Sequence, residues 1–310
     1  MVDRATNLKS LQNFSLTTSW DELDQMSLEQ FDAFLADRGL LWRARKCPGC
    51  RSPRSLTRQL GSGGQNVRMK FECSRKQCRQ PGVRRKIGYL KDTFFEKLRG
   101  SRKKLFLASV LFVDDLGRVE DRALRCNVTG QAIIQWDQWF RDVIVKSFFE
   151  NDAPRKIGGP GTVLQIEETY TPEAVYGRCR LAADNWVVMG IIESSKEIFL
   201  EIASKRDAAT LDSIITKHVS PGTIIGNLGY VHRTVDHEEV VDGSSSDVQD
   251  PKDRAEDAWS RIQQTLKRLG LEGALSDDHF LESVWKWQHR SEPKLYLLWS
   301  EISKQYPLAD

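Results

Sequence analysis

Four cysteines carry the clearest chemical signal in this chain. Cys47 and Cys50 form a C-x2-C pair, and Cys73 and Cys78 form a C-x4-C pair. A stretch with a glycine-rich tip, typical of a β-hairpin, separates the two pairs, so four thiolates can surround one ion tetrahedrally. The spacing predicts a structural zinc site of the zinc-ribbon kind. Four reduced thiols without metal are disfavoured by the paired spacing, and a disulfide framework is unusual in an intracellular chain.

A second signal is a pair of adjacent glutamates, Glu167 and Glu168. They end an apolar run that follows the glycine-rich segment IGGPG. A strand that delivers a carboxylate at its tip is a common component of a site for Mg²⁺ or Mn²⁺. Two solvated charges at a strand end are the competing interpretation, and both remain open on the residues alone.

The charge is concentrated around the cysteines. From Arg43 to Lys104 the chain has 20 Lys and Arg against three acidic residues, a local balance of +17, whereas the formal charge of the whole chain is +3 and the remainder therefore carries −14. Such a segment attracts polyanions, and its arginines can contact phosphates without reading a base sequence. The candidate nucleic-acid-binding residues are Arg51, Arg54, Arg58, Arg68, Arg75, Arg79, Arg84, Arg85 and Lys86.

The elements that position these groups suggest several domains, as the length of 310 residues allows. The expected order is a helical lead-in over residues 1–42, a basic zinc-ribbon-like module over 43–100, a helical region over 101–155, an α/β domain over 156–275 and C-terminal helices over 276–310. The first residues lack the features of a signal peptide, and no apolar run is long enough for a membrane span. We therefore expect an intracellular protein without a membrane partner.

The region 101–155 has the rhythm of a helix-turn-helix. An apolar helix over 103–113 precedes a short helix, a turn at 127–129 and a second helix. Gln131, Gln135 and Gln138 of that second helix can face a DNA groove. A plain helical hairpin is favoured over this interpretation, because it explains Ile133 and Trp136 completely as core residues.

The segment 156–275 predicts an ordered series of strands and helices. The strands are expected at 162–170, 185–193, 197–204, 223–227 and 230–235, with helices at 207–219 and 254–269. This order is that of the RNase H-like fold, in which acids from the first strand, the fourth strand and the last helix meet at one edge to hold two Mg²⁺ or Mn²⁺ ions. By position the three groups are Glu167 or Glu168, Asn227 and Glu256.

Several short motifs stand in a fixed order in this half of the chain: IGGPG, VLQIEETY, WVVMGIIE, FLEIASKRDAATLDSII, HVSPGTII, GYVHRTVDH and AEDAWSRIQQTLKRL. TFFE, WFRD and FLESVW flank them, from Thr93, Trp139 and Phe280 respectively. Over about residues 85–290 they resemble the DDE transposases of the Merlin type and their bacterial insertion-sequence relatives, which commonly carry a cysteine-paired knuckle ahead of this region. The resemblance implies an RNase H-like transposase core, with a zinc ribbon and a helix-turn-helix-like region before it.

The resemblance also locates departures from the family's acidic triad. The first metal-binding aspartate of the family falls on Glu167 and the second on Asn227, which is neutral, while the third acid is kept as Glu256. Only Leu228 and Gly229 join Asn227 to the next expected strand, where the family has a helical crossover, and two residues cannot connect parallel strands. These departures predict that two-metal DNA cleavage has been lost.

The resulting expectation is a domesticated, transposase-derived protein of the nucleus that binds DNA or chromatin with the help of structural zinc. Mg²⁺ or Mn²⁺ is expected only if the acidic edge survives. One alternative is an active DDE transposase that cleaves and transfers DNA strands, and another is a protein-interaction scaffold. DNA is the expected partner, other nuclear proteins are further candidates, and a homodimer is implied because such transposases often dimerise.

Overall fold

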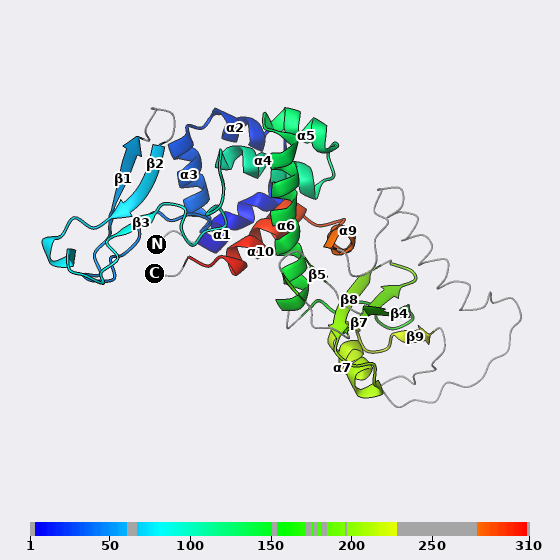
Figure 1. Ribbon diagram of the computed structural model, residues 1–310. Coiled ribbons are helices and arrows are strands. Elements are labelled where there is room, and N and C mark those ends of the chain that lie inside the picture. The colour runs from blue at the N-terminus through cyan, green and yellow to red at the C-terminus, as the bar shows by residue number, and fades with distance from the viewer. Residues whose placement is uncertain are drawn as a thin grey trace, which may run out of the picture. The chain divides into compact units, whose positions relative to one another are not determined.

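The computed structural model describes residues 4–60, 67–150, 154–171, 175–176, 179–180, 185–195, 197–227 and 278–308. The chain divides into two compact units (Figure 1). Unit 1 combines Met1–Asp137 with Glu292–Asp310, and unit 2 is Gln138–Ser291. The structure is of the mixed α/β class, with a four-cysteine cluster beside a small antiparallel sheet.

Unit 1 is largely helical. Its helices are α1 (Arg4–Lys9), the 3₁₀ turn η1 (Ser10–Asn13), α2 (Ser19–Gln25), α3 (Leu28–Asp37), α4 (Arg102–Val113), α5 (Val119–Cys126), the first part of α6 (Gly130–Glu150), and α10 (Lys294–Gln305). Helices α1, α2 and α3 lie in the segment 1–42, for which a helical lead-in was predicted. Ser27 begins α3 with a reciprocal capping box to Gln30, which satisfies amide groups at the helix start.

The core of unit 1 forms around α4, which is buried along most of its length because it is apolar on every side. Phe106 of α4 packs edge-on against Phe31 of α3 at 5.9 Å and stacks on Trp299 of α10 at 5.3 Å between ring centroids. Trp299 Nε1 donates a hydrogen bond to Ser109 Oγ at 3.0 Å, so the indole N–H is satisfied inside the core. The amphipathic C-terminal segment of the chain is thus a core element of unit 1.

A three-stranded antiparallel sheet completes unit 1. It consists of β1 (Ser55–Leu60), β2 (Val67–Glu72) and β3 (Lys86–Gly88) in that order, with the single turn η2 (Lys76–Cys78) between β2 and β3. β1 and β2 form the hairpin that was predicted between the two cysteine pairs. Asp32 of α3 fastens the sheet to the helices, since it accepts two bonds from Arg102 at 2.6 and 2.7 Å and one from the Tyr89 hydroxyl at 3.2 Å.

The helix, turn and helix predicted after α4 are confirmed as α5, a turn and α6. Asn127 ends α5 in the left-handed conformation with φ of 49°, which asparagine tolerates better than most residues. Ile133 and Trp136 are buried, as the helical-hairpin interpretation requires, whereas Gln131 and Gln135 are exposed.

Unit 2 contains a four-stranded sheet in the order β8-β7-β4-β9. Its elements are β4 (Val163–Thr171), β7 (Asn185–Ile192), β8 (Ile198–Ala203), α7 (Ala208–His218) and β9 (Ile224–Asn227); a separate pair is formed by β5 (Val175–Tyr176) and β6 (Cys179–Arg180), and α9 spans Asp278–Gln288. β4, β7 and β8 are antiparallel neighbours, and β9 returns through α7 to pair in parallel with β4. The strands and the helix predicted between 162 and 227 are confirmed; the strand expected at 230–235 and the helix at 254–269 lie outside the described residues.

The core of unit 2 lies between this sheet and α7. Leu164 and Ile166 of β4 are buried with Ile214 of α7. Phe199 of β8 covers Gly190 so closely that a Cβ there would lie 2.1 Å from the ring. A glycine is therefore needed in the middle of β7, although glycine ordinarily weakens a strand.

Candidate metal centre

The four cysteine sulfurs converge in unit 1, as the spacing predicted. All four Sγ atoms lie within 4.8 Å of one another. The Sγ atoms of Cys47 and Cys78 are 3.7 Å apart, and those of Cys50 and Cys73 are 3.8 Å apart. Zn–S bonds of about 2.3 Å in a tetrahedron place the sulfurs about 3.8 Å from each other. The separations fit a four-thiolate zinc centre, and no disulfide joins these cysteines.

Two short loops carry the ligands. In the first, Cys47 N–H donates to the Ser52 carbonyl at 2.8 Å, and Arg51 N–H donates to the Cys47 carbonyl at 2.8 Å. Arg51 has φ of 57°, which turns the chain back. In the second, Cys73 immediately follows β2 and Cys78 ends η2, so the sheet and one helical turn set the positions of this pair.

Packing closes the centre against water. Cys47, Cys73 and Cys78 are buried, Cys50 is half-buried, and Val83 packs against the group. A Cβ at position 49 would lie 2.9 Å from Val83 Cγ1 and 3.4 Å from Cys78 Sγ, so glycine permits this approach. A closed, all-protein ligand set is typical of structural rather than catalytic zinc.

Backbone amides favour the thiolate form in the first loop. Burial raises the pKa of Cys47, but hydrogen bonds from the backbone of Cys50 and Gly49 outweigh it and lower the pKa to about 6. The backbone of Ser52 lowers the pKa of Cys50 in the same way. Burial raises the pKa of Cys78 to about 12, and a divalent cation at the centre would oppose that effect because thiols bind metal as thiolates.

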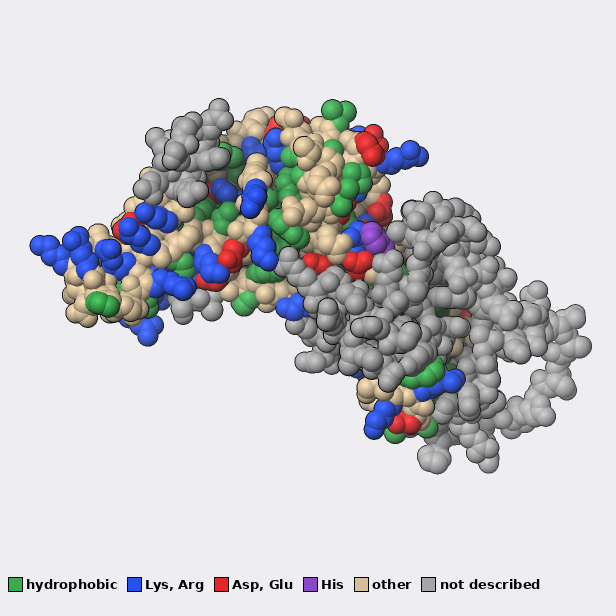
Figure 2. Space-filling view, in the orientation of Figure 1, with side chains coloured by type: hydrophobic (Ala, Val, Ile, Leu, Met, Phe, Trp, Pro, Cys, Tyr) green, Lys and Arg blue, Asp and Glu red, His purple; other side chains and the backbone are tan. Residues whose placement is uncertain are grey.

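The predicted phosphate-binding cations have different environments. In Figure 2, Lys and Arg side chains gather at the end of unit 1 where Figure 1 draws β1–β3 and their loops. The exposed ones are Arg51, Arg58, Arg75, Arg79, Arg84 and Lys86, and Arg85 is half-buried. Arg54 is buried and donates from Nη2 to the Arg84 carbonyl at 2.7 Å, so it supports the module from inside. The Arg68 side chain lies outside the described part of the structure.

The predicted acidic edge is described in part. Glu167 lies in β4 opposite Met189 of β7, and its neighbour Ile166 lies opposite Asn227 of β9. The backbone positions predicted to match the first two acids of the family triad are therefore close, on adjacent parallel strands: Asn227 ends β9, and Glu167 lies in the middle of β4. The side chains of Glu167, Glu168 and Asn227 and the whole of Glu256 are outside the described residues.

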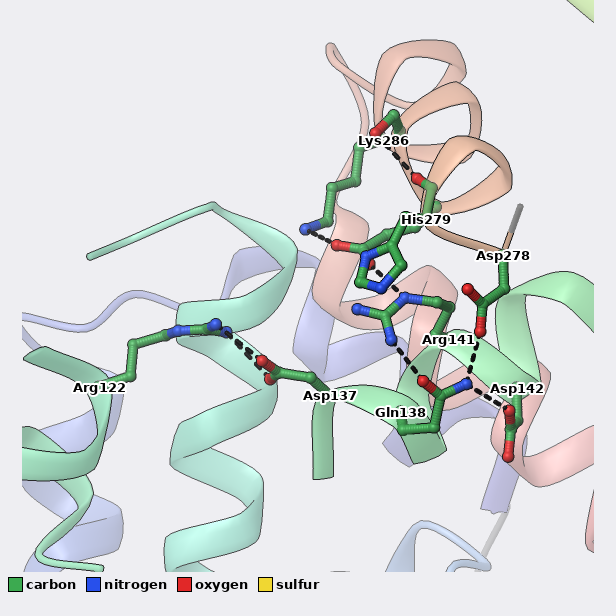
Figure 3. A network of polar contacts seen from close by, with 10 residues as sticks. Arg122, Asp137, Gln138, Arg141, Asp142, Asp278, His279 and Lys286 are labelled. Carbon is green, nitrogen blue, oxygen red and sulfur yellow. Dashed lines mark hydrogen bonds and ion pairs between the residues drawn. The ribbon is translucent and has the colours of Figure 1, made fainter. Parts of the chain in front are cut away.

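A buried polar network in unit 2 was not predicted (Figure 3). Arg141 Nε of α6 donates to Glu282 Oε2 of α9 at 2.8 Å, and Lys286 Nζ donates to Glu282 Oε1 at 2.6 Å. Gln138 Nε2 donates to Asp142 at 3.0 Å and to Asp278 at 2.6 Å, so the third of the glutamines that could face a DNA groove is engaged within unit 2. The only sequence signal was the presence of charged residues inside the aromatic motifs WFRD and FLESVW.

Comparison of the chain with family models, with curated proteins and with solved structures finds no match. Among the described helices, none combines the length and the apolar character that crossing a membrane requires.

Proposed function

We propose that this chain is a transposase-derived protein that binds nucleic acid through a zinc-stabilised basic module and no longer cleaves DNA. The observation that carries the proposal is the convergence of four thiol groups at zinc-like separations inside a segment with a charge balance of +17. Bound zinc would supply a cross-link between the two loops. The arginines around it would then be held in fixed positions from which they can contact phosphates.

The sheet of unit 2 supports the transposase-derived part of the proposal. The sheet has the order β8-β7-β4-β9. Three antiparallel strands are followed by a helix and by a fourth strand that is parallel to the first. This is the arrangement expected for an RNase H-like core. The pairing of Ile166 with Asn227 adds support, because it puts Asn227 beside the neighbour of Glu167 on β4. We infer that this part of the chain descends from a DDE transposase core.

We infer the loss of DNA cleavage from the side chains that stand at the predicted metal-binding positions. Asn227 replaces a charged ligand, and a neutral amide is a weaker ligand than a carboxylate for a hard cation such as Mg²⁺. The extra methylene of Glu167 relative to aspartate also displaces the first carboxylate.

Duplex binding should be strongly salt-dependent. The purified, zinc-loaded chain is expected to bind two duplexes of unrelated sequence with similar affinity, because phosphate contacts carry no base information. The logarithm of the affinity should fall linearly with the logarithm of salt concentration, with a slope of about −0.9 for each phosphate contacted. Fluorescence anisotropy at several salt concentrations measures this slope. A duplex with uncharged methylphosphonate linkages is the control and should not bind; binding to the natural duplexes that is absent or insensitive to salt would contradict the proposal.

Incubation with supercoiled plasmid and Mn²⁺ should leave the plasmid intact, because the edge lacks its second carboxylate. Gel electrophoresis detects a single nick per molecule. The nearness of the Glu167 and Asn227 positions is the one observation that favours the second candidate, an active two-metal transposase. Nicking that disappears in Glu256→Gln would establish that candidate.

A further inference from the structure

Several cations of unit 1 already have carboxylate partners. Arg43 pairs with Asp37, Lys91 Nζ lies 2.7 Å from Glu96, and Lys304 Nζ lies 2.5 Å from Glu301. Arg58 likewise lies 2.9 Å from Glu29, and Lys86 lies 3.3 Å from Glu72. The positive charge of these residues is already compensated within the molecule.

A different group of cations borders the cysteines. It consists of Arg51, Arg75, Lys76, Arg79 and Arg84, which we call the cysteine-loop cations. All five are exposed, and within the described part of the chain their side chains form no ion pair or hydrogen bond. The sequence from Cys73 to Lys91 contains no acidic residue that could compensate them. Their charge is thus available to an external anion.

The four-cysteine cluster positions four of these five cations, because they are neighbours of its cysteines in the sequence. Arg51 directly follows Cys50, Arg75 and Lys76 stand between Cys73 and Cys78, and Arg79 directly follows Cys78. η2 is one turn of 3₁₀ helix, closed by bonds of 3.1 Å from Cys78 N–H to the Arg75 carbonyl and 3.0 Å from Arg79 N–H to the Lys76 carbonyl. A turn this short has little stability of its own. The second loop is also held by the bond from Cys73 N–H to the Arg85 carbonyl.

The module offers no aromatic surface to nucleobases. Between Arg43 and Lys91 the only aromatic residues of the sequence are Phe71 and Tyr89, and both are buried. Proteins that hold single strands without sequence preference combine a cationic groove with exposed aromatic rings on which bases stack. Phosphates of a duplex, whose bases are already stacked, match a surface of guanidinium groups alone.

We infer that the five cysteine-loop cations form the phosphate-contacting surface of this protein, and that the surface takes the backbone of a nucleic-acid duplex in preference to a single strand. The inference rests on the proposed function and specifies where and how the ligand is held. Lys76 belongs to this surface although it was not among the predicted phosphate-binding residues, and Arg54 and Arg58 do not contribute to it.

The test compares two triple variants with the same loss of charge. Arg75→Gln/Lys76→Gln/Arg79→Gln removes three cysteine-loop cations, and the matched control Arg43→Gln/Lys91→Gln/Lys304→Gln removes three cations that have carboxylate partners. The slope of log affinity against log salt for a duplex should become shallower by about 2 to 3 in the first variant, since each phosphate contact contributes about 0.9. In the control it should change by less than about 1. Native mass spectrometry should find one zinc in both proteins, which verifies that the module has folded.

The outcomes separate the inference from the proposed function. If the slope of log affinity against log salt became shallower by the same amount in the two variants, the assignment of the surface would be wrong. The proposal that the protein binds a duplex would not be affected. Absence of salt-dependent duplex binding by the unaltered protein would refute the proposed function and the inference with it. A single strand of equal length, or vesicles containing phosphatidylserine, should bind more weakly than the duplex; equal or tighter binding of either would overturn the choice of ligand.

Discussion

Replacing Cys78 with serine is expected to abolish zinc binding and to unfold the sheet β1–β3. Apparent binding free energies of structural Zn²⁺ in small zinc modules are about 10–16 kcal/mol, and this free energy is also folding free energy. Among the side chains of the three-stranded sheet that the structure describes, Phe71 is the only buried one, and Tyr89 joins it directly after β3, so little else replaces that contribution. Native mass spectrometry should count one zinc in the unaltered protein and none in the variant, and amide exchange should lose its protection in β1–β3.

Cys126→Ser is the matched control for this experiment. Cys126 is also a buried, free cysteine, but it ends α5 and does not belong to the four-sulfur cluster. Its replacement should leave the zinc count at one. Retention of one zinc at unchanged affinity in Cys78→Ser would contradict the assignment of the centre. Amide exchange in α4 should stay slow in both variants, because the packing of Phe106 on Trp299 does not depend on the metal.

Replacing Glu282 with glutamine should destabilise unit 2 by about 3–5 kcal/mol, the usual cost of leaving a buried charge without its partner. The side chains of Arg141 and Lys286 are only 8% and 11% exposed, so water cannot take over the role of the carboxylate. Urea unfolding followed by circular dichroism measures the change. Glu197→Gln is the control: its partner Arg155 is 78% exposed, and the expected change is below about 1 kcal/mol. A similar small effect of both changes would show that the network is not important for stability.

Because of the same carboxylate, we expect the free energy of unfolding of unit 2 to fall at acid pH. Burial raises the pKa of Glu282, but Lys286 and Arg141 outweigh this effect and lower the pKa below its usual value. A carboxyl group with a lowered folded-state pKa contributes stability that is present above its unfolded pKa, near 4.3, and is lost as the pH falls through the folded pKa. Glu282→Gln should therefore flatten the loss of stability below about pH 4.3, which repeated urea titrations between pH 2 and 6 would measure.

The local features of the fold followed from sequence because each depends on neighbouring residues. The cysteine pairs are separated by a hairpin, so their spacing alone predicted that the four sulfurs would converge. Alternating and continuous apolar runs located β4, β7, β8 and α7. These signals need no knowledge of distant parts of the chain.

Long-range polar pairs could not be predicted in the same way. Arg141 and Glu282 are 141 residues apart, and Asp32 and Arg102 are 70 residues apart. Nothing in the sequence near either member identifies the other, because charged side chains on a helix are usually solvated. The sequence also did not reveal which arginines around the cysteines have partners within the molecule. Arg54 and Arg58 were therefore predicted to bind phosphate together with Arg75 and Arg79.

The position of Trp299 in the centre of unit 1 has a consequence for biosynthesis. Ser109 leaves the ribosome 190 residues before the indole that it will contact, a delay of about 10 to 40 s at ~5–20 residues per second. During this interval the apolar surface of α4 has no α10 to cover it, while all of unit 2 is being made. The core around α4 can therefore be completed only after α10 has been synthesised. The four cysteines, in contrast, have all been synthesised once residue 78 is added, so they can bind their metal early in synthesis.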